Sequence, residues 1–133
     1  MARAPALASF TAAALLLGAA AFAQPGALAS STPEQRAKLQ TELMVEKLGL
    51  APDQIPKVEA INLMYAKKME PVLKGNEGPL VKLRAAKGID QEKAADLEKV
   101  LSKQQYQQYL AAKEEMRQEV ERRIAERRAG GAN

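Results

Sequence analysis

The stretch TPEQRAKLQTELMVEKLGLAPDQ, residues 32–54, decides the fold. It opens with a capping box, in which the Thr32 hydroxyl can accept from the third helical N–H and the Gln35 side chain can reach back to the cap. Apolar residues then recur every three or four positions, which is typical of the buried face of a helix. Gly49 stands where a helix commonly ends, and residues 50–54 begin a second helix. The stretch therefore predicts two helices joined by a tight turn.

The second helix is predicted to begin at Asp53 as its N-cap, which places Pro56 in the first turn. Pro71 is expected to kink or to end this helix, since a proline removes one helical hydrogen bond. Residues 74–79 read as a loop, and a short helix is expected from Leu80 to about Ala86, ending at Gly88.

Helical periodicity also covers the rest of the chain, where Asp90 is the predicted cap of another helix. Ser102 opens a second capping box, which either starts a new helix or lies inside a continuous one. The last helix should extend to about Arg128. Together these signals predict an all-α fold without strands, a small antiparallel assembly of about four to five helices in a single domain over residues 32–128.

The N-terminus resembles a secretion signal. Arg3 precedes an uncharged apolar run over residues 7–21, and Ala21-Phe22-Ala23 offers the small residues that a signal peptidase requires. We predict a signal peptide over residues 1–23 with cleavage before Gln24, and before Ser30 as the second choice. The run is too short to span a bilayer, so no stable membrane span is expected in the cleaved chain.

Export would place the product in the periplasm or outside the cell. The predicted domain would then be flanked by a flexible N-terminal segment, residues 24–31, and by a disordered tail, residues 129–133.

The composition argues against most catalytic chemistry. The chain of 133 residues has no His, no Cys and no Trp. Nucleophile pairs that need His or Cys, and zinc or haem sites that use these ligands, are therefore excluded. Exposed-looking carboxylate pairs such as Glu114 and Glu115 offer no pocket that would raise a pKa for acid–base work. We expect no enzyme activity, no cofactor and no metal site.

The net charge of +4 is unevenly distributed. Residues 57–87 carry seven Lys or Arg and three Glu, whereas residues 88–133 carry nine charges of each sign. Because an exported protein does not meet cytoplasmic nucleic acid, we expect this basic segment to serve another partner and predict no nucleic-acid binding.

Two short elements carry a family resemblance. They are Leu50-Ala51-Pro52-Asp53-Gln54 and Leu101-Ser102-Lys103-Gln104-Gln105, each at a predicted helix start. On an exported helical chain they resemble the paired LTXXQ motifs of the Spy/CpxP family of periplasmic proteins. The first copy departs from the pattern at Ala51, where the family has a hydroxyl residue. The matching motif residues are Leu50, Pro52, Gln54, Leu101, Ser102 and Gln105.

The resemblance implies thin, curved helical dimers that include ATP-independent chaperones and stress adaptors. A homodimer is also expected from composition, since the chain has little aliphatic material for a thick core. The partners implied are unfolded or partly folded envelope polypeptides.

The leading hypothesis is therefore an exported, non-enzymatic polypeptide-binding protein. Its candidate client surface combines lysines, which attract acidic segments, with adaptable methionines. The residues of this surface are Met64, Lys67, Lys68, Met69, Lys82, Arg84 and Lys87. The alternatives are a periplasmic metal-stress sensor or accessory protein without a His-based site, and a plain structural protein of the envelope.

Overall fold

The structure is a computed structural model that describes residues 26–131, and all regular structure in this range is helical. Its elements are α1 (Gly26–Ser30), α2 (Pro33–Leu48), α3 (Gln54–Lys74), α4 (Pro79–Val100) and α5 (Lys103–Gly130). The all-α prediction is confirmed for this range, which contains five helices and no strand. The predicted signal peptide, residues 1–23, lies outside the described residues.

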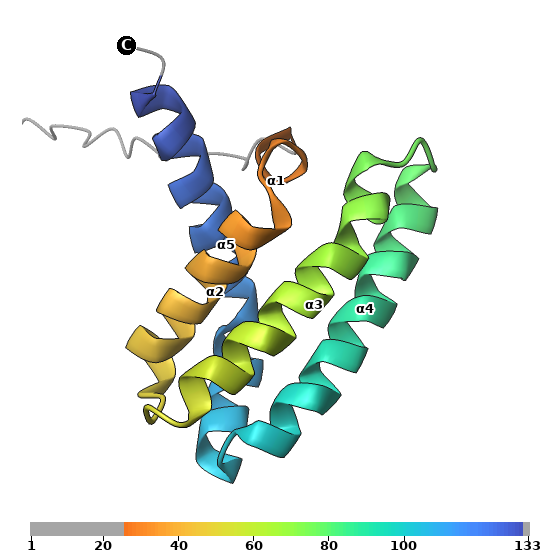
Figure 1. Ribbon diagram of the computed structural model, residues 1–133. Coiled ribbons are helices and arrows are strands. Elements are labelled where there is room, and N and C mark those ends of the chain that lie inside the picture. Colours follow the sequence, from red (N-terminus) through yellow and green to blue (C-terminus); the bar gives the residue numbers. More distant parts are fainter. Residues whose placement is uncertain (1–25, 132–133) are drawn as a thin grey trace, which may run out of the picture.

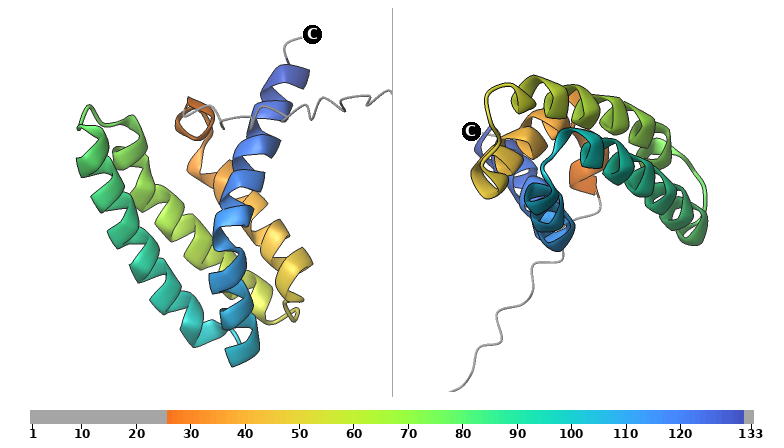
Figure 2. Two further views of the ribbon diagram at one scale, coloured as in Figure 1. Left: turned by 180° about the vertical axis from the view of Figure 1, so that it is seen from behind. Right: turned by 90° about the horizontal axis from the view of Figure 1, so that it is seen from below.

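Helix α3 is the central element of the fold (Figure 1). Helix α3 lies beside α2 and also beside α4, while α5 packs on α2. Helices α4 and α5 touch each other only weakly. Seen end on, the helices make a bent layer in which α4 and α5 flank the open, concave side (Figure 2, right).

Three helix ends follow directly from local sequence. Thr32 caps α2 through the predicted capping box: its Oγ1 accepts from the Gln35 N–H at 3.1 Å, and Gln35 Oε1 accepts from the Thr32 N–H at 3.0 Å. Gly49 ends this helix with φ of +62°, which glycine adopts without strain. The Ser102 box starts a new helix, α5, and so decides the question that the sequence left open.

The cap predicted at Asp53 is in the expected position but makes no side-chain hydrogen bond, and the cap predicted at Asp90 is wrong. Asp53 precedes α3 as expected, but its backbone is helical and its side chain makes no capping hydrogen bond. Asp90 caps nothing, because α4 runs unbroken from Pro79 through Gly88 to Val100. A glycine inside a helix costs only about 1 kcal/mol. Packing of α4 along α3 outweighs that cost, so the predicted short helix and its successor are one helix.

Pro71 neither ends nor splits its helix. Helix α3 continues for one turn beyond it, to Lys74. Pro71 and Lys67 are both exposed, so water can satisfy the Lys67 carbonyl that the proline leaves without a helical donor. The turn then needs Gly75, where an added Cβ would lie 2.7 Å from the Pro71 carbonyl oxygen.

The segment expected to be flexible, residues 24–31, instead contains α1. Ala27 is buried, and the Ser31 hydroxyl donates to the Leu28 carbonyl at 2.6 Å. At the other end, α5 reaches Gly130, two residues further than predicted. No short-range pattern announces α1, because its order depends on contacts with α3 and α5.

The core lies where α2 crosses α3 and α5. Most of its members are aliphatic, and they are joined by Met44, Met116, Tyr109 and the polar Asn62. The largest fully buried side chains are Leu39, Leu43, Met44, Leu97, Val58, Val120 and Asn62. This thin core joins α2 to α3, α4 and α5.

Candidate functional site: the paired turns and the concave groove

The two family-like motifs meet at the end of the molecule where the α2–α3 and α4–α5 turns lie. Gln54 Nε2 donates to Gln105 Oε1 at 2.7 Å, and Gln105 Nε2 donates back to Gln54 Oε1 at 3.0 Å. Each glutamine also caps its own turn, since Gln54 Oε1 accepts from the Ala51 N–H at 2.8 Å and Gln105 Oε1 from the Ser102 N–H at 2.9 Å. The glutamines therefore cross-link turns that are 51 residues apart in the sequence.

The other motif residues support these turns. Leu50 and Leu101 are buried in the core, while Pro52 is exposed. Gln54 Nε2 additionally donates to the Val100 carbonyl at 3.0 Å. Ala51 has no hydroxyl to accept from the Gln54 N–H, which donates instead to the Ala51 carbonyl at 2.9 Å, so the first turn closes without a hydroxyl. The motifs thus have a structural role that single capping boxes would not explain.

We expect Gln54→Ala and Gln105→Ala each to lower the free energy of unfolding by about 1 kcal/mol, since each removes partly buried hydrogen bonds. The double variant should lose less than the sum, with a coupling energy of about 0.5 kcal/mol or more. Urea unfolding of the four proteins measures this cycle. Strictly additive losses would show that the two amides act only as separate caps.

A groove of about 680 Å³ opens between α3, α4, α5 and α2 on the concave side. Its walls include Met44, Met69 and Met116, whose unbranched side chains adapt to apolar groups of varied shape. Leu73, Leu83 and Ile89 extend the apolar wall along α3 and α4. The volume is in the range of ligand sites, which is about 300–1,000 Å³.

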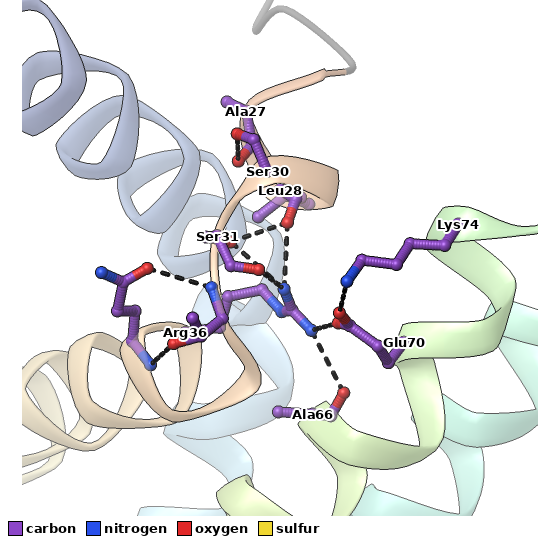
Figure 3. Close-up of polar contacts among 10 residues, drawn as sticks. Ala27, Leu28, Ser30, Ser31, Arg36, Ala66, Glu70 and Lys74 are labelled. Carbon is purple, nitrogen blue, oxygen red and sulfur yellow. Dashed lines mark hydrogen bonds and ion pairs between the residues drawn. The ribbon is translucent and has the colours of Figure 1, made fainter.

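Arg36 lies at the end of the groove near α1 and ties three helices together (Figure 3). Its Nη1 donates to the Leu28 and Ser31 carbonyls at 3.0 and 2.7 Å, and its Nη2 donates to the Ala66 carbonyl at 3.3 Å. Nη2 also forms an ion pair with Glu70 at 2.5 Å. The guanidinium is therefore the hydrogen-bonding centre that joins α1 and α2 to α3.

Glu70 is held ionised by two cations. Lys74 Nζ lies 2.6 Å from one of its carboxylate oxygens and Arg36 bonds the other. Hydrogen bonds from Lys74 and then from Arg36 hold the pKa of Glu70 below its usual range.

Polar contacts also join α3 to α4 beside the groove. Tyr65 donates its phenol proton to Asp96 at 2.5 Å, and this hydrogen bond, together with burial, raises the pKa of Tyr65 to about 12. Lys68 lies over the Tyr65 ring at 4.8 Å and pairs with Glu92 at 3.1 Å. These contacts fix the long wall that α3 and α4 form together.

Two of the seven predicted client-surface residues line the groove, namely Met69 and Lys87. Met64, Lys67, Lys68, Lys82 and Arg84 lie outside its lining. Lys68 is engaged by Glu92, whereas Met64 is 42% exposed on another part of α3. The predicted surface is thus divided between the concave side and other faces.

The candidate surface predicted from the sequence leaves out most of the groove lining, including Leu83, Lys93 and Met116. The predicted short helix ends before Gly88, so it does not show that the apolar face containing Leu83 continues along α4. Lys93 was counted among balanced charges because its burial depends on α2 and cannot be read from α4 alone.

Comparison with protein families places residues 23–109 in a match to a family described as a domain of unknown function, DUF4890. The chain belongs to the DUF4890 family. No curated protein and no solved structure matches the chain.

The DUF4890 match includes both glutamine turns, Arg36 and Lys93, and it ends at Tyr109 in the first part of α5. The remainder of α5, which supplies Met116 and Val120 to the groove, lies beyond the matched residues.

Two absences apply to residues 26–131 of this DUF4890 chain. None of the helices there is long and apolar enough to cross a membrane. Within the same range, no three acidic, His or Cys side chains gather in a way that could hold a metal ion.

Proposed function

We propose that the chain is an exported, non-enzymatic polypeptide-binding protein that holds unfolded or partly folded envelope polypeptides on its concave side. The single observation that carries the proposal is the groove, whose apolar wall is rich in methionine and open to solvent. Such a wall suits clients without a fixed shape. The paired motif turns add support, because the two motifs that carry the resemblance to the Spy/CpxP family are joined by hydrogen bonds between Gln54 and Gln105.

The structure also bears on the proposed export. Cleavage before Ser30 would remove buried Ala27 and the Leu28 carbonyl that accepts from Arg36. Cleavage before Gln24 would keep α1 whole, and the DUF4890 match begins at residue 23. Of the two proposed cleavage sites, these observations favour the one that makes Gln24 the first residue of the mature chain.

The proposed homodimer has one feature in its favour. Leu80 and Val81 are 71% and 51% exposed at the tip of the α3–α4 pair and lie outside the groove lining. A second copy of the chain would bury apolar surface that the monomer leaves in water.

We expect the mature chain to slow aggregation of a denatured model protein without nucleotide. Leu83→Glu should abolish most of this effect, because it places a charge on the apolar wall of the groove. Leu83 is 64% exposed, so the substitution should leave folding intact. Light scattering during dilution of the denatured protein measures the outcome.

Met64→Glu is the matched control, since Met64 is also exposed but lies outside the groove. Loss of activity in this variant alone would instead favour the surface predicted from the sequence. If the unmodified chain at several-fold molar excess does not slow aggregation of the model protein, the chaperone proposal is wrong.

A further inference from the structure

The groove contains a lysine without a carboxylate partner. Lys93 Nζ donates to Gln40 Oε1 at 2.7 Å, and among residues 26–131 no acidic side chain lies within ion-pair distance of it. Burial lowers the pKa of Lys93 to about 8, while the negative charge of Asp90 acts in the opposite direction. A partly buried ammonium with an amide as its side-chain partner retains donors for an anion.

The carboxylates that line the groove near Lys93 are already engaged. Asp90 pairs with Lys113 at 2.6 Å, and Arg117 pairs with Glu114 at 2.5 Å and with Glu121. The carboxylates around Lys93 are therefore occupied by other cations. The site keeps an excess positive charge at Lys93.

An apolar stripe leads to this amine along α4. Leu83, Ala86 and Ile89 precede Lys93 at helical spacing, and all four line the groove. The ten residue-to-residue steps from Leu83 to Lys93 span about 15 Å of helix. Across the groove, α3 contributes a parallel apolar wall through Met69 and Leu73. An elongated apolar channel thus has Lys93 towards one end as its partly buried cation without an ion pair, while the other lining lysine without an ion pair among the described residues, Lys87, is exposed.

We propose that this groove binds a free long-chain carboxylate, with its carboxylate on Lys93 Nζ and its alkyl chain along the stripe from Ile89 to Leu83. A charge-assisted hydrogen bond would satisfy the lysine, and the chain would cover the apolar wall. This ligand class goes beyond the proposed polypeptide binding. Because both would use the same groove, a bound carboxylate would compete with polypeptide clients.

The test is calorimetric titration of the mature chain with laurate below its micelle concentration, beside dodecyltrimethylammonium, which has the same tail and the opposite charge. We expect one laurate per chain and at least tenfold tighter binding of laurate than of the cation. Lys93→Met should weaken laurate binding about tenfold or more and erase the preference, since it removes the amine but keeps an apolar side chain of similar length.

Lys67→Met is the control, because Lys67 is exposed and lies outside the groove, and it should bind laurate as the unmodified chain does. Equal affinity of the unmodified chain for both amphiphiles, or unchanged laurate affinity in Lys93→Met, would overturn the inference. Failure here is distinguishable from failure of the proposed function, because the aggregation assay contains no amphiphile.

Discussion

Arg36→Ala is expected to lower the free energy of unfolding by about 3–5 kcal/mol, the cost typical of breaking a buried ion pair. The guanidinium is almost completely buried and satisfies the carbonyls of Leu28, Ser31 and Ala66. Its loss leaves the Ser31 carbonyl without its guanidinium donor and leaves Glu70 with Lys74 alone, while the Leu28 carbonyl keeps its bonds from Ser31. Urea unfolding followed by circular dichroism measures the change.

Arg122→Ala is the matched control. Arg122 also pairs with two carboxylates, those of Glu119 and Glu126, but its side chain is 55% exposed. An exposed pair contributes about 0–1 kcal/mol, so this variant should stay close to the unmodified chain. Similar losses in both variants would mean that burial of Arg36 is not what makes its contacts valuable.

The Arg36 effect should shrink in acid. Folding lowers the pKa of some carboxyl groups. Such a group stabilises the protein at pH values above its pKa in the unfolded chain, and this stabilisation is lost as the pH falls through its pKa in the folded chain. Glu70 is such a group. At pH 3 the difference between the two proteins should therefore be smaller than at pH 7, because less of the ion pair remains to be lost.

Signals that act over three or four residues predicted the fold well. The capping boxes at Thr32 and Ser102 and the helix end at Gly49 need only local hydrogen bonds, and the structure has all three. Gly88 and Asp90 misled the prediction because their local preferences are weak beside the packing of α4 on α3. The start of α1 has no local signal, because this helix depends on its contacts with α3 and α5.

The groove was less predictable because it depends on pairs of distant residues. Methionines and lysines were singled out by type, but only Met69 and Lys87 of that set face the groove. The link between Gln54 and Gln105 joins two turns whose separation in space is fixed by the whole fold. The environment of Lys93 likewise includes Gln40 from α2, and this contact between distant residues cannot be predicted from composition.

Lys93→Met should raise the free energy of unfolding by about 1–3 kcal/mol at pH 7, because replacing a poorly compensated buried charge with an apolar side chain is commonly stabilising. Burial lowers the pKa of Lys93 in the folded chain to about 8, below the ordinary value of 10.5. Between these values the unfolded chain binds more protons, so the stability of the unmodified protein rises with pH. The advantage of the variant is therefore complete below pH 8 and should vanish as the pH approaches 10.5.

Thermal unfolding of the two proteins from pH 7 to pH 10 measures this convergence. Tyr65 and Tyr109, whose pKa values are raised by folding, are present in both chains, so their contribution largely cancels in the difference. A constant difference across this range would show that Lys93 is not destabilising through its charge. A variant that is more stable yet no longer prefers laurate would identify Lys93 as a residue kept for binding at the expense of stability, since a purely structural lysine would not couple the two effects.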